Sequence, residues 1–95
     1  MKPSDRVTAE RLAKYFDYTK RALFEARKAI NPSEKKIADD FLDMASRYYS
    51  DAEHFAAQGD IVTAFAALNY AHGWLDAGAR AGFFLVTNNE LFVVD

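Results

Sequence analysis

The most constraining feature of this sequence is a long segment, residues 61–81, in which only Asp76 and Arg80 are charged. Its helical periodicity gives two apolar faces. One face carries Ala64, Phe65, Leu68, Ala71, Leu75 and Ala79, and the other carries Ala66, Ala67, Tyr70, Trp74, Ala77 and Ala81. A helix that is apolar on most sides must be buried on most sides, either at the centre of the fold or in a contact between subunits. We therefore expect a helix over residues 61–81 that ends at Gly82.

Two amphipathic helices are predicted ahead of this segment. The first covers about residues 5–30, and its core stripe is Leu12, Phe16, Thr19, Leu23, Ala26 and Ile30. Asn31-Pro32 ends it, because proline disfavours helical conformation in the preceding residue, and the same dipeptide starts a second helix over about residues 32–58. Gly59 suits the left-handed position after that helix, and Asp60 suits the N-cap of the next. The pattern predicts an all-α fold, a three-helix bundle with long antiparallel helices.

The C-terminal tail, residues 83–95, has a different character. Two short aromatic and β-branched runs flank a turn-like Thr87-Asn88-Asn89-Glu90 segment. They could form a small hairpin, or they could be an extended tail packed over the bundle. We expect the helices and the tail together to form one domain over residues 1–95.

Composition narrows the class of protein further. The chain has 95 residues, which leaves room for one domain, and no cysteine, which excludes a disulfide framework and a cysteine nucleophile. The net charge is only -2, but residues 1–30 hold eight basic and four acidic side chains, whereas residues 31–60 hold three and seven. The N-terminus lacks the apolar segment of a secretory signal, and no stretch approaches the length of a membrane span of roughly 18 residues. We expect a cytoplasmic protein without a membrane partner.

Most of the sequence resembles a known family. The similarity runs from the first helix through Gly82, and its most specific part is the run Ala71-His72-Gly73-Trp74-Leu75-Asp76-Ala77-Gly78. It resembles the archaeal domain-of-unknown-function family 357, a set of small helical-bundle proteins. The resemblance implies a compact three-helix bundle from an archaeal cytoplasm, and it implies no activity.

A polar strip interrupts the third helix at Asn69, His72, Asp76 and Arg80. Counting outward from the Gly59-Asp60 turn brings Asp43 and Arg47 of the second helix near this strip. The six side chains could form one groove that transfers protons or binds a carboxylate or phosphate group. The alternative is an interhelical ion-pair network that fixes the register of the helices.

Metal binding has weak support in the sequence. His54 and His72 could recruit Asp51 or Asp76, but no metal-ligand spacing is present. The carboxylates of the second helix are predicted to form a solvated face paired with basic groups of the first helix; they are Asp39, Asp40, Asp43, Asp51 and Glu53. We expect no metal, no cofactor and no catalytic residue.

Function is predicted in three ranked forms. The first is a non-enzymatic interaction or self-association module, a homo-oligomer with a dimer favoured or a binder of another protein, with an interface at Tyr70, Trp74, Phe83, Phe84 and Phe92. The second is a small ligand-binding protein or enzyme that uses the His72, Asp76 and Arg80 groove for a nucleotide or another phosphorylated ligand. The third, not favoured, is nucleic-acid binding through Arg6, Arg11, Lys14, Lys20, Arg21, Arg27 and Lys28. The sequence leaves the ligand, the partner and the oligomeric state open.

Overall fold

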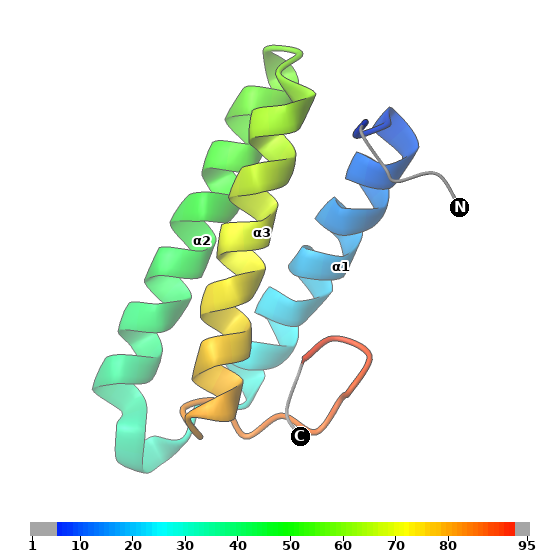
Figure 1. The fold of residues 1–95 in the computed structure, drawn as a ribbon. Coiled ribbons are helices and arrows are strands. Elements are labelled where there is room, and N and C mark those ends of the chain that lie inside the picture. Colours follow the sequence, from blue (N-terminus) through cyan, green and yellow to red (C-terminus); the bar gives the residue numbers. More distant parts are fainter. Residues whose placement is uncertain (1–5, 93–95) are drawn as a thin grey trace.

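A computed structural model describes residues 6–92 and shows an all-α fold, which confirms the predicted class (Figure 1). The helices are α1 (Ala9–Lys28), α2 (Lys35–Ala57) and α3 (Ile61–Arg80), with a single 3-10 turn, η1 (Pro32–Glu34), before α2. α2 runs opposite to α1 and α3, and α3 contacts both of the other helices. The α2–α3 contact is the most extensive, and α1 and α2 touch each other least.

A side-chain cap sets the start of α1, and pairing with the tail sets its end. The Thr8 side chain accepts a hydrogen bond from the Arg11 amide at 3.0 Å, so the helix begins at Ala9 and not near the predicted residue 5, which lies outside the described residues. At the other end Ile30 leaves the helix and forms a β-bridge with Phe84. The Asn31 amide then donates to the Phe83 carbonyl at 2.9 Å. Pairing with the tail therefore ends α1 at Lys28, two residues before the predicted boundary.

The turns on either side of α2 lie where the sequence predicts them. Asn31 caps through its side-chain oxygen, which accepts from the Ser33 amide at 3.1 Å. Because the turn that follows is 3-10, α2 itself begins at Lys35 and not at residue 32. Gly59 adopts φ +81°, and the Asp60 side chain accepts from the Thr63 amide at 3.2 Å, as expected for the start of α3.

Small residues line the contact between α2 and α3. On α2 the fully buried alanines Ala38, Ala45 and Ala52 recur every seven residues, and on α3 the buried residues Ala64, Ala71 and Gly78 do the same. Each α2 member stands as far before Gln58 as one α3 member stands after it, so the two series match in an antiparallel register. Such a ladder lets two helix backbones approach closely.

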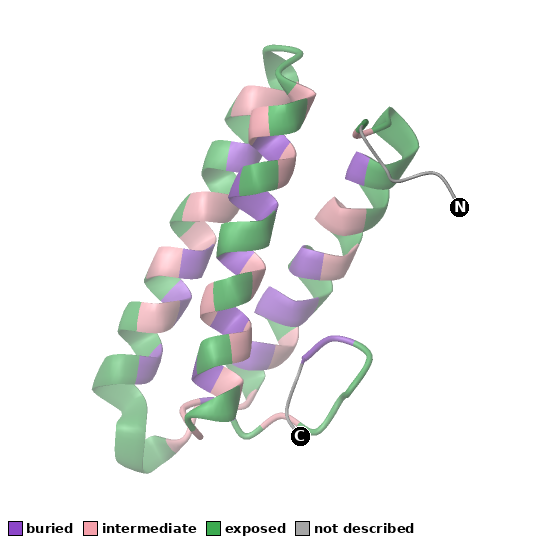
Figure 2. Cartoon of the chain, viewed as in Figure 1, coloured by how far each residue is buried: buried purple, intermediate pink, exposed green. Residues whose placement is uncertain are grey.

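The side of α3 that faces away from α1 and α2 is exposed to solvent (Figure 2). Its fully exposed members up to residue 77 are all uncharged; they are Val62, Ala66, Asn69, Tyr70, Gly73 and Ala77. The half-buried Asp76 and the exposed Arg80 border them at the C-terminal end of the helix. Of the two alternatives that the sequence left open, burial at the centre of the fold is not observed, because α1 and α2 cover only one side of α3. Burial in a contact between subunits stays a prediction. We call these six residues the uncharged α3 face.

The tail packs over the bundle and forms no hairpin within residues 83–92; residues 93–95 lie outside the described part of the chain. Leu85 donates its amide to the Ala29 carbonyl at 2.7 Å, and a turn at Asn88 then sends Leu91 and Phe92 inward. The side chains of Phe84, Leu91 and Phe92 are buried in the same core cluster as Leu23 and Leu75. None of the helices within residues 6–92 is long and apolar enough to cross a membrane.

Two glycines of α3 provide a matched pair for testing this packing. A methyl group at Gly78 would overlap the buried Phe84 ring, whereas a methyl group at Gly73 would meet no atom within 4 Å. We expect Gly78→Ala to lower the free energy of unfolding by about 1–3 kcal/mol. We expect Gly73→Ala to raise it by about 0.5–1 kcal/mol, because alanine favours helix. Urea unfolding followed by circular dichroism measures both, and equal effects would contradict the close contact at Gly78.

Candidate functional site

An apolar groove opens along the exposed side of α3. It is lined by Phe41 of α2 and by Asn69, Tyr70, Gly73, Trp74 and Ala77 of α3, with a volume of about 550 Å³. We call it the aromatic groove.

Aromatic contacts form the wall of this groove. Tyr70 stacks on Tyr48 with ring centroids 5.3 Å apart, and Trp74 meets the Phe41 ring edge-on at 5.0 Å. Phe83 of the tail also meets the Phe41 ring edge-on, with the centroids 5.0 Å apart. Tyr70 nevertheless remains 63% exposed. The wall is therefore held by ring-to-ring contacts while much of its apolar surface faces solvent.

The structure changes the membership of the predicted interface. Tyr70 and Trp74 line the groove and Phe83 supports it, but Phe84 and Phe92 are each only 1% exposed. These two rings fill the core, because the tail folds inward, and they offer no surface to a partner. Phe41 and Tyr48, which the sequence did not indicate as interface residues, are half-buried on α2 and contact Trp74 and Tyr70. Phe41 also packs against the core.

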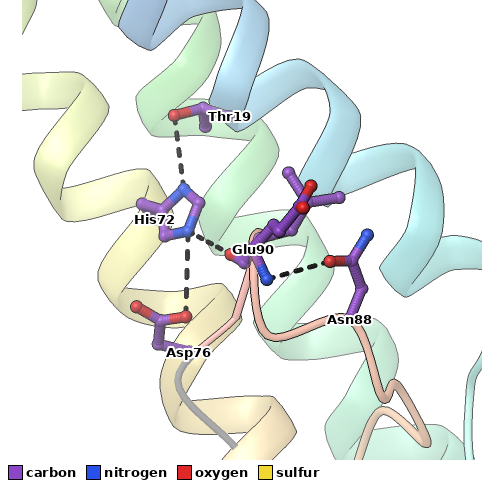
Figure 3. A network of polar contacts seen from close by, with 6 residues as sticks. Thr19, His72, Asp76, Asn88 and Glu90 are labelled. Carbon is purple, nitrogen blue, oxygen red and sulfur yellow. Dashed lines mark hydrogen bonds and ion pairs between the residues drawn. The ribbon is translucent and has the colours of Figure 1, made fainter.

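His72 occupies a separate site between α3, α1 and the tail (Figure 3). Its Nε2 lies 2.7 Å from the Leu91 carbonyl oxygen, so Nε2–H donates to this acceptor. Nδ1 lies 3.5 Å from the Thr19 hydroxyl. The ring also stacks flat on Tyr18, with centroids 4.5 Å apart and an interplanar angle of 4°. The imidazole thus joins α1, α3 and the tail, and both of its nitrogens have partners.

The six residues of the predicted polar groove are spread over four places. His72 and Asp76 come together, with Nε2 and Oδ1 3.7 Å apart. Asp43 and Arg47 pair with each other on the exposed side of α2 at 2.9 Å. Asn69 lines the aromatic groove, and Asp76 and Arg80 line a further hollow with Ala77 and Ala81. The cause is helical geometry: His72 faces α1, whereas Asn69 and the α2 pair lie on other sides of their helices.

Two tyrosines, Tyr18 beside His72 and Tyr49 of α2, have raised pKa values. Burial raises the pKa of the Tyr18 phenol, and the nearby Asp76 carboxylate and Tyr15 add to the rise. Burial also raises the pKa of Tyr49, with Glu53 and Asp17 contributing. A phenol with a raised pKa keeps its proton, so Tyr18 acts beside His72 as an uncharged stacking partner.

Charge is divided between the two outer helices. α1 carries six basic and three acidic side chains, and α2 carries three basic and five acidic ones. Two α2 carboxylates pair within their own helix, Asp39 with Lys35 at 2.6 Å and Asp43 with Arg47, and not with the basic groups of α1 that the sequence suggested. All the basic side chains of α1 are exposed, and that of Lys28 lies over the Phe24 ring, 4.6 Å from its centroid. In the part of the chain that the structure describes, no three His, Asp or Glu side chains gather as a metal site requires.

The fold and its sites define a small three-helix protein with an exposed aromatic groove and a histidine that joins its tail to the bundle. The sequence profile of the family described as "Protein of unknown function (DUF357)" matches residues 14–84. The chain therefore belongs to this family, as the resemblance indicated. No curated protein and no solved structure matches the chain.

The His72 contacts predict a specific loss when the donor is removed. His72→Phe keeps a flat ring beside Tyr18 but leaves the Leu91 carbonyl without its hydrogen bond. We expect the free energy of unfolding to fall by about 1–3 kcal/mol, and the Leu91 and Phe92 amides to exchange faster with solvent. His54→Phe, at an exposed position of α2, is the control, with a change within about 0.5 kcal/mol. Unchanged exchange at the tail in His72→Phe would show that this histidine does not hold it.

Proposed function

We propose that this chain is a non-enzymatic interaction module that self-associates through the uncharged α3 face and the aromatic groove beside it. The observation that carries the proposal is that every fully exposed residue of α3 from 62 to 77 is uncharged. Charged side chains make up 27% of the whole sequence. A solvent-facing helix surface without them is typical of a surface that a partner covers.

The residues on this face have the properties of interface anchors. Tyr70 and Val62 are 63% and 69% exposed, and Trp74 is half-buried at the groove wall. Tyrosine and tryptophan supply large contact areas and are enriched among residues that dominate binding energy. Gly73 and Ala77 lie beside these rings and would admit another helix at short distance. These features support a helix-to-helix contact more than the binding of a small polar ligand.

The self-association is tested at Tyr70. Tyr70→Glu places a charge in the centre of the face without disturbing a buried group, so we expect it to abolish the dimer at concentrations where the unaltered chain is dimeric. Leu85→Glu is the matched control, since this tail residue is 59% exposed and its amide is bonded to the Ala29 carbonyl at the end of α1. Size exclusion with light scattering measures the mass of each. A monomeric unaltered chain at high concentration would contradict the proposal.

A second candidate function rests on the hollow lined by Asp76, Ala77, Arg80 and Ala81. A guanidinium at the rim of a hollow is suited to a phosphate group, which supports the binding of a phosphorylated ligand. Arg80 lies in the last turn of α3, however, where the negative end of the helix dipole opposes an anion. We therefore rank this function below self-association.

Inorganic phosphate tests this candidate directly. If phosphate binds, a concentration ten times its Kd stabilises the fold by about 1.4 kcal/mol, and the melting temperature rises by several degrees. The rise should be absent in Arg80→Gln and present in Arg47→Gln, whose guanidinium pairs with Asp43 on α2. No rise, or the same rise in Arg80→Gln, would exclude a phosphate site here.

A further inference from the structure

We propose that the partner on the uncharged α3 face is a second copy of this chain, related by a twofold axis that runs alongside α3. The two α3 helices then pack in parallel, and each α1 lies opposite the α2 of the other copy. This arrangement rests on the proposed self-association and specifies its geometry.

The charge of the two outer helices selects this axis. α1 and α2 both pack on α3 and touch each other least, and α1 has an excess of basic side chains whereas α2 has an excess of acidic ones. A twofold axis parallel to α3 exchanges the two edges that these helices form, which places the basic α1 of one copy opposite the acidic α2 of the other, twice. A twofold axis that crosses α3 at right angles would oppose α1 to α1 and α2 to α2. Complementary potentials across an interface determine orientation, and opposed like charges are unfavourable.

The centre of the face also suits two parallel copies. Asn69, Gly73 and Ala77 follow one another at intervals of four residues along the exposed side of α3, and Gly73 has open space where a Cβ would stand. Small residues at these positions allow the two helix backbones to approach closely. When the twofold axis runs alongside α3, each residue of this stripe lies opposite the same residue of the second chain.

Asn69 is self-complementary in this position. Its side-chain amide both donates and accepts, so two copies of Asn69 at one height can hydrogen-bond to each other across the axis. A single asparagine in an apolar helix contact is a known determinant of register and of oligomeric state. In an antiparallel pair with residue 62 opposite residue 77, Asn69 would instead meet Tyr70.

Cysteine crosslinking distinguishes the two geometries, since the chain has no cysteine of its own. Val62→Cys and Ala77→Cys place single thiols on the face, about 22 Å apart along α3. In the parallel arrangement each variant forms a disulfide with a second copy of itself under mild oxidation, and the products run as dimers on a non-reducing gel. Ser50→Cys, exposed on α2, is the control for collisional crosslinking.

The outcomes separate this inference from the proposed function. Crosslinks of Val62→Cys and Ala77→Cys each to itself, above the control, support the parallel pair. A crosslink that forms only when the two variants are mixed overturns the parallel pair and leaves self-association intact. A monomeric mass with no crosslink above the control overturns both.

Charge reversal tests the pairing of the edges independently. Arg21→Glu with Lys28→Glu on α1 should weaken dimerisation by about tenfold. Asp40→Lys with Asp51→Lys on α2 should do the same. All four substitutions in one chain should restore the affinity, because the edges are then complementary again with the signs exchanged. An affinity that neither pair changes would overturn the placement of α1 opposite α2.

Discussion

The close contact of α2 with α3 through small side chains is the constraint on which the rest of the structure depends. The alanine and glycine positions that recur every seven residues bring the two backbones together. Phe41 and Tyr48 of α2 contact Trp74 and Tyr70 of α3 beside this contact. Phe41 and Trp74 also pack against the core, so the aromatic groove lies where the core of the helix pair reaches the surface.

The remaining core is completed by residues of α1 and the tail, which lie outside this helix pair. α1 touches α2 little, and the wedge that it leaves is filled by Phe84, Leu91 and Phe92 of the tail. His72 connects these parts because it donates to the Leu91 carbonyl while stacking on Tyr18 of α1. A polar residue on an otherwise apolar helix therefore has a structural task, and the hydrogen bonds of its two nitrogens argue for that task over proton transfer at this position.

Sequence periodicity predicted the helices and the turns well, because both depend on local chemistry. Gly59 and Asp60, for example, adopt the conformation and the cap expected of them. The path of the tail could not be predicted from the sequence. It depends on the pairing of Phe84 with Ile30 and on the packing of the Phe84 ring against Gly78, which are both tertiary contacts. The polar groove was predicted by counting from the turn. Counting gives the height of a residue on its helix but not the direction of its side chain, so His72 and the Asp43–Arg47 pair were assigned to one place although they face different ways.

The short turn between α2 and α3 also bears on the order in which the chain folds. α2 and α3 are joined by a tight turn, so their contacts close short loops and form at little entropic cost. The contacts of the tail join segments about fifty residues apart in sequence, such as Asn31 with Phe83. A nucleus made of the α2–α3 hairpin would thus form first, α1 would dock on it, and the tail would close the core last. Substitutions in the ladder should then slow folding, whereas substitutions in the tail should mainly accelerate unfolding.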